Sequence, residues 1–106
     1  MTYPLFQREG ARRDILEIVD HISDDSPAAA AALYEAYESS LNLLRKTPDL
    51  GRLYPSLDPR LAQIRLWPIL RFPNYLIFYR HSGERVEVLR IWHGARDIPA
   101  LLSDLD

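Results

Sequence analysis

The chain has 106 residues, of which 47% are hydrophobic and 26% charged, and its formal net charge is -2. This length leaves room for one hydrophobic core, so a single domain spanning residues 1–106 is expected. The absence of cysteine excludes disulfides and thiolate zinc sites, and three histidines make a metal centre improbable, so neither metal nor cofactor is expected.

The N-terminal segment lacks the features of an export signal. Residues 1–8 show no basic start followed by an apolar run, and no stretch of the chain approaches the length of a membrane span. A reducing, cytoplasmic location without membrane contact is therefore expected. The β-type residues from Tyr3 to Gln7 predict a weak first strand, in which Pro4 is confined to the strand start or to a sheet edge.

Two consecutive helices are predicted after Gly10. In the first, apolar residues recur at the three-and-four spacing of an amphipathic helix, while Asp14 and other charged residues fall mostly on the remaining faces. A polar cluster then restarts the chain, because Ser26 is a natural N-cap and Pro27 fits the first helical position. The second helix keeps its period for about five turns and stops before Thr47, and it is expected to form an antiparallel hairpin with the first. The apolar positions are Ile15, Ile18, Val19 and Ile22, then Leu33, Tyr37, Leu41 and Leu44.

The second half of the chain changes to strand-like patterns. Proline and glycine predict a loop from Thr47 to about Arg60, and β-branched and aromatic residues then predict three strands. These strands are Ala62 to Trp67, Leu70 to Arg80 and Arg85 to Trp92, the last two joined by a tight hairpin at residues 81–84. Asp97 can cap a short final helix. The predicted fold class is α+β: an N-terminal strand, an α-helical hairpin, a three-stranded mainly antiparallel sheet and a short C-terminal helix.

Charge is distributed unevenly along the chain. Residues 1–50 carry five basic and nine acidic side chains, whereas residues 60–96 carry seven arginines and two glutamates. A guanidinium group presents a planar fork of donors that suits carboxylate and phosphate groups. The sheet half is therefore expected to be positive and to bind an anionic partner.

Short segments spread over nearly the whole chain have a familiar order and spacing. Together they resemble the ParE/RelE superfamily, the toxins of type II toxin-antitoxin (plasmid stabilisation) systems. The segment after the final predicted strand, residues 93–97, is the most specific of them. The resemblance is carried by Ala11-Arg12-Arg13-Asp14-Ile15, Ser26-Pro27-Ala28-Ala29-Ala30, Thr47-Pro48, Gly51-Arg52, Arg65, Tyr75-Leu76-Ile77-Phe78-Tyr79-Arg80 and Val88-Leu89-Arg90-Ile91-Trp92-His93-Gly94-Ala95-Arg96-Asp97.

The resemblance implies a RelE/ParE-like fold and a cognate antitoxin whose acidic or amphipathic segment wraps the toxin. In the ParE branch the toxin inhibits DNA gyrase without catalysis of its own, whereas RelE-like toxins cut messenger RNA in the ribosome. The RelE branch commonly has a lysine-rich surface and a C-terminal Tyr or His. Here residues 99–106 are apolar and acidic, and Lys46 is the single lysine, so the ParE activity is favoured.

Six residues are expected to bind the antitoxin or the target. The arginines on predicted strands would form a solvent-facing positive row, the alternative being an ordinary solvated sheet face. Trp92 could be a partner contact or part of the core. No catalytic residue is expected; if the chain were a nuclease, Arg65, Arg80 and His93 would be the set able to supply a base and cations. The six expected binding residues are Arg65, Arg80, Arg90, Trp92, His93 and Arg96.

Three functions remain open on sequence grounds, in this order. The first is a gyrase inhibitor neutralised by an antitoxin, and the second is a ribosome-dependent endoribonuclease. The third is an inactive relative that keeps only the antitoxin-binding surface.

Overall fold

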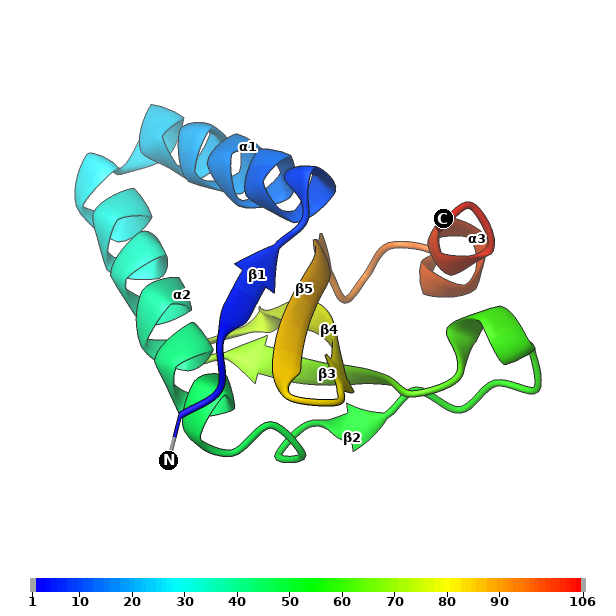
Figure 1. Cartoon of the computed structure of the whole chain (residues 1–106). Coiled ribbons are helices and arrows are strands. Elements are labelled where there is room, and N and C mark those ends of the chain that lie inside the picture. Colours follow the sequence, from blue (N-terminus) through cyan, green and yellow to red (C-terminus); the bar gives the residue numbers. More distant parts are fainter. Residues whose placement is uncertain (1, 106) are drawn as a thin grey trace.

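Residues 2–105 are described by a computed structural model, and the ends of the predicted domain, Met1 and Asp106, lie outside the described residues. A mixed five-stranded sheet carries α1 and α2 on one face, with α3 beyond the other (Figure 1). The order in the sheet is β1-β5-β4-β3-β2, and only β1 and β5 are parallel. None of the helices in residues 2–105 has the length and apolarity to cross a membrane. The elements are β1 (Leu5–Gln7), α1 (Glu9–Asp25), α2 (Pro27–Lys46), β2 (Arg52–Leu53), the 3-10 turn η1 (Pro59–Leu61), β3 (Ile64–Ile69), β4 (Phe72–Ser82), β5 (Arg85–His93) and α3 (Ile98–Ser103).

The sheet is larger than the three strands predicted after the helices. The predicted first strand is confirmed, and it lies alongside β5 at one edge. At the other edge, β2 forms inside the predicted loop, where Arg52 lies opposite Leu66 and Leu53 opposite Arg65. The two residues of β2, Arg52 and Leu53, are too few to show an alternating pattern, so β2 depends on pairing with β3 rather than on local propensity.

The two predicted helices are confirmed, but they open in a V from Ser26 and do not lie antiparallel as expected (Figure 1). The Ser26 hydroxyl accepts a hydrogen bond of 3.1 Å from the Ala29 amide, and Pro27 occupies the first turn of α2. This cap satisfies one of the free amides at the helix start and separates the two helices sharply. The predicted C-terminal helix is also present, and Asp97 caps it through the Ala100 amide at 3.3 Å.

Apolar side chains gather on both faces of the sheet. On the face below α1 and α2, a large cluster joins the helices to the strands, and on the opposite face a smaller cluster packs under α3 and η1. Both faces of the central strands are therefore covered, which explains why the middle of β4, Tyr75 to Tyr79, is a continuous run of apolar and aromatic residues. The first cluster includes Ile15, Leu33, Tyr37, Leu44, Ile77, Tyr79, Val88 and Ile91, and the second Leu61, Leu66, Phe78, Leu89, Trp92 and Leu102.

The loop after α2 is held to the sheet by buried hydrogen bonds. The Tyr79 hydroxyl donates to the Pro48 carbonyl at 2.7 Å and accepts from the Gly51 amide at 2.8 Å. Burial raises the pKa of this phenol, which stays protonated and able to donate. A Cβ atom at Gly51 would lie 2.6 Å from the Tyr79 oxygen and 2.8 Å from the Leu66 carbonyl oxygen. Only glycine therefore fits where the loop approaches the sheet.

Replacing Tyr79 with Phe is expected to destabilise the fold by about 2 kcal/mol, because two buried backbone groups lose their hydrogen-bond partner. Tyr75→Phe is the matched control, since it removes a hydroxyl from the same strand at a half-buried position. Urea denaturation of the two variants and the parent chain measures the difference. Equal midpoints for Tyr79→Phe and Tyr75→Phe would show that the loop does not depend on this phenol.

Candidate functional site

A buried carboxylate joins α1 to the edge of the sheet. Asp14 is 7% exposed, and its two oxygens accept from the Arg90 guanidinium at 2.7 and 2.9 Å. The Ile91 amide donates to the same carboxylate at 2.9 Å. Hydrogen bonding to Asp14 raises the pKa of Arg90 above its ordinary value. A bidentate pair supplemented by a backbone donor satisfies most of the carboxylate's acceptor sites and fixes the side chain in one orientation.

This ion pair corrects two sequence-based expectations. Asp14 was assigned to an outer face of the first helix, but its side chain is buried against β5. Arg90 was expected in a solvent-facing row, but its guanidinium is bound internally by Asp14 and lies 5.0 Å from the centre of the Trp92 ring. Helical periodicity predicts that charged residues face solvent. That prediction fails for a charged side chain that pairs with an opposite charge from a distant part of the chain.

A groove of about 320 Å³ opens beside the ion pair, between α1 and the ends of β4 and β5. The lining residues of α1 recur at intervals of three and four residues, so four side chains of this helix lie on one face and form one wall of the groove. The opposite wall comes from β4, β5 and the segment that follows β5. The lining residues on α1 are Asp14, Glu17, Ile18 and His21, and those opposite are Tyr75, Ile91, Trp92, His93 and Arg96.

His93 has a defined orientation at the rim of this groove. Its Nδ1 atom accepts a hydrogen bond of 3.0 Å from the Ala95 amide, and its ring meets the Tyr75 ring edge-on at 5.1 Å. In the neutral imidazole the proton then resides on Nε2, which is left as a donor. Arg96 follows in the same turn, where its amide donates to the His93 carbonyl at 3.1 Å. His93 and Arg96 thus lie together at the rim of the groove.

Trp92 contributes to the groove mainly as part of the core. The residue is 1% exposed, and its ring packs 5.1 Å from the Phe78 ring. Of the two alternatives for Trp92, the structure selects core packing over an exposed partner contact. The reason is that α3 covers this side of β5 and places Leu102 in the same cluster.

Arg65 and Arg80 lie away from the groove and on opposite faces of the sheet. Arg65 is paired with Tyr79 on the helix side, and Arg80 is paired with Ile64 in the cluster on the other side. Arg65 donates to the Gly51 carbonyl at 2.7 Å and so supports the loop after α2. The expected continuous row of exposed arginines therefore does not form.

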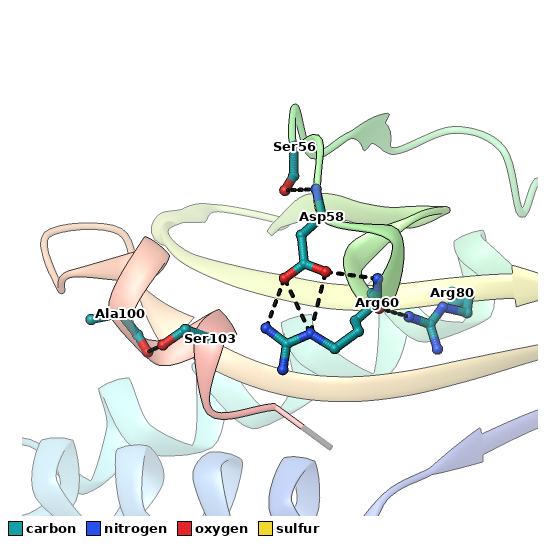
Figure 2. Close-up of polar contacts among 6 residues, drawn as sticks. All are labelled: Ser56, Asp58, Arg60, Arg80, Ala100 and Ser103. Atoms are coloured by element: carbon teal, nitrogen blue, oxygen red, sulfur yellow. Dashed lines mark hydrogen bonds and ion pairs between the residues drawn. The ribbon is translucent and has the colours of Figure 1, made fainter.

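Arg80 makes its contact with η1 (Figure 2). Its guanidinium donates to the Arg60 carbonyl at 3.1 Å, and the Arg60 side chain is bound by Asp58, with a shortest distance of 2.7 Å. Hydrogen bonding to Arg60 lowers the pKa of Asp58. Like Arg65, Arg80 is used partly to hold a connecting segment against the sheet.

The residues named for a nuclease do not converge. His93 is paired with Tyr75 on β4, whereas Arg80 lies five residues further along that strand, a separation of about 16 Å at the usual strand rise. Arg65, opposite Tyr79, lies four residues from Tyr75 along β4. His93 and Arg96 instead share the groove with Glu17, His21 and Tyr75. Sequence reasoning missed these three, although Glu17 and His21 are four residues apart on one helix face.

Two solved structures have a similar fold. The ParDE toxin-antitoxin system of P. aeruginosa matches with a TM-score of 0.69 and 22% identity, covering 87% of this chain and 96% of that chain. The RelBE2 toxin-antitoxin complex of Mycobacterium tuberculosis matches with a TM-score of 0.60 and 23% identity, covering 88% and 99%. The fold of this chain is therefore the α+β fold found in these two toxin-antitoxin structures.

Sequence comparison supplies the family. Toxin RelE1 of Caulobacter vibrioides is 34% identical over 94 residues, covering 89% of this chain and 96% of that protein. Residues 5–98 match the family described as the ParE toxin of the type II toxin-antitoxin system parDE. The chain therefore belongs to the ParE toxin family of the ParE/RelE superfamily, as the resemblance predicted.

Replacing Asp14 with Ala is expected to destabilise the chain by about 2–3 kcal/mol, because the buried Ile91 amide and the partly exposed Arg90 guanidinium lose their acceptor. Asp14→Asn keeps the shape and one acceptor, so its effect is expected to be smaller. Glu17→Gln, on the next turn of the same helix, is the control. The free energies of unfolding are measured by denaturant titration. An equal loss of stability in Glu17→Gln and Asp14→Ala would contradict a special role for Asp14.

Proposed function

We propose that this toxin inhibits DNA gyrase by binding, and that a cognate antitoxin neutralises it in the cytoplasm by covering the groove between α1 and β5. The observation that supports this most is the arrangement of the groove. Ile18 and Ile91 give it apolar lining, and His93 and Arg96 add a ring donor and a cation, a combination suited to a protein segment with apolar and acidic side chains.

Binding without catalysis is supported by the arginines. Arg65 and Arg90 are engaged in intramolecular hydrogen bonds, and Arg65 and Arg80 lie away from His93. A phosphodiester-cleaving site needs an acid or base and cations around one phosphate. The set Arg65, Arg80 and His93 is too widely spread to surround one.

A ribosome-dependent endoribonuclease is the second candidate, and one observation favours it. The groove brings together two imidazoles, a phenol and a guanidinium, from His21, His93, Tyr75 and Arg96. These are residue types able to transfer protons and to stabilise a phosphate. The third candidate, an inactive relative, keeps the antitoxin partner and loses the target.

A single pair of assays separates these candidates. Purified toxin is incubated with gyrase, ATP and supercoiled plasmid, and in parallel with messenger RNA and ribosomes. The proposal expects linear plasmid after denaturation of the gyrase and intact RNA. Cleaved RNA without linear plasmid would replace gyrase inhibition with the nuclease, and no effect in either assay would leave the inactive relative.

Arg96→Ala is expected to weaken plasmid linearisation, or affinity for the antitoxin, roughly tenfold, because it removes the cation at the rim of the groove. Lys46→Ala removes an exposed cation at the far end of α2 and should change neither quantity. Both variants should keep the melting temperature of the parent. Parent-like values of both quantities for Arg96→Ala would remove this groove from the binding surface.

A further inference from the structure

Residues 54–61 form an arm that projects from the sheet between β2 and β3 (Figure 1). In this arm Leu57 is 103% exposed, so its whole side chain lies in solvent. Two prolines, Pro55 and Pro59, restrict the backbone on either side of the leucine. A leucine that buries no surface contributes nothing to the hydrophobic stabilisation of its own chain, so its place in the arm points to a contact with another molecule.

Hydrogen bonds hold the arm in one conformation (Figure 2). The Asp58 carboxylate accepts from the Arg60 amide at 2.9 Å and binds the Arg60 guanidinium at 2.7 Å, and the Ser56 hydroxyl accepts from the Asp58 amide at 3.1 Å. At the far end of the arm, Arg80 donates to the Arg60 carbonyl and Leu61 is buried in the smaller apolar cluster. Because the arm is already ordered, a contact through it costs little conformational entropy.

An apolar hollow of about 250 Å³ lies at the base of the arm, on the face of the sheet opposite α1 and α2. For comparison, a cavity of about 150 Å³ is left in a protein core when a buried leucine is shortened to alanine. The hollow therefore has room for one leucine side chain. It is lined by Tyr54, Pro55, Leu66, Leu76, Phe78 and Ile98 among others.

The exposed leucine and the hollow are close neighbours in the chain. Leu57 follows Pro55, a lining residue, by two positions, which places their Cα atoms within about 8 Å of each other. Since Leu57 is fully exposed, it does not fill the hollow of its own chain. A surface that carries an apolar projection beside an apolar hollow of matching size is complementary to itself, as a two-fold interface requires. The occupant that fits this surface is a second copy of the chain.

The charges on this surface are complementary as well. Arg52 also lines the hollow, and its guanidinium makes no ion pair within residues 2–105. Asp58 follows Leu57 directly, and its side chain is 31% exposed. When Leu57 of one copy enters the hollow of the other, Asp58 comes with it toward Arg52. A carboxylate has enough acceptor sites to bind this second guanidinium in addition to that of Arg60.

We propose that the toxin self-associates through the arm, as a two-fold dimer in which Leu57 of each copy fills the hollow of the other. This inference goes beyond the proposed function. The hollow and the groove between α1 and β5 have no lining residue in common, so the dimer can form or fail to form whatever binds in the groove.

Sedimentation of the purified toxin at rising concentration tests the proposal. The parent chain is expected to form a reversible dimer, and Leu57→Asp should raise the dissociation constant at least roughly tenfold, because a carboxylate would have to enter an apolar hollow. Leu16→Asp is the matched control, since it places the same charge at an exposed leucine of α1 and should leave the dissociation constant unchanged. Thermal melting checks that both variants fold.

Two results of this experiment overturn the proposal. One is a parent chain that stays monomeric up to about 1 mM. The other is equal dimerisation of Leu57→Asp and Leu16→Asp. If the parent is monomeric and Leu57→Asp also loses plasmid linearisation, the arm contacts the target and not a second copy. Plasmid linearisation by the parent chain itself tests the proposed function separately.

Cross-linking between two variants tests the arrangement of the dimer. The parent chain has no cysteine, so Leu57→Cys places a single thiol on the arm and Ile98→Cys a single thiol in the hollow. Oxidation of an equimolar mixture should link the two variants by a disulfide, because insertion of the arm brings the thiols within reach. A mixture of Leu16→Cys with Ile98→Cys is the control and should form little linked dimer. Equal yields from the two mixtures overturn the proposed contact.

Discussion

The carboxylate of Asp14 is the constraint on which the rest of this molecule depends. The strand β1 ends at Gln7, opposite Val88, so β5 continues beyond its neighbour with its edge exposed. The chain turns directly into α1, and one turn later Asp14 supplies the acceptor that the Ile91 amide would otherwise lack. A helix side chain thus completes the edge of the sheet where the neighbouring strand stops. Asp14 and Ile91 both line the groove, so this contact joins its two walls.

Three arginines of the sheet half make hydrogen bonds within the fold. Arg65 supports the loop after α2, Arg80 holds η1, and Arg90 is paired with Asp14. Each makes charge-assisted hydrogen bonds, which are stronger than neutral ones and suit segments without regular structure. Arg96, by contrast, is exposed at the rim of the groove.

Local patterns in the sequence account for most of the fold. The two helices, the Ser26 cap and the three long strands follow from spacing and capping residues, which act over a few positions. β2 and the burial of Asp14 could not be predicted, because each depends on a partner far along the chain: Leu66 for Arg52, and Arg90 for Asp14. The site followed the same division. His93 and Arg96 were expected from a contiguous segment of the sequence, whereas Glu17, His21 and Tyr75 line the same groove only through the packing of α1 on the sheet.

Hydrogen exchange at the Ile91 amide tests this account most directly. If Asp14 completes the edge of β5, this amide should exchange in the intact chain only through unfolding of the sheet, at a rate close to that of the central β4 amides. Exchange at the rate of a solvent-exposed loop amide, in a chain that is otherwise folded, would show that the carboxylate does not bind there and that α1 is positioned by apolar packing alone.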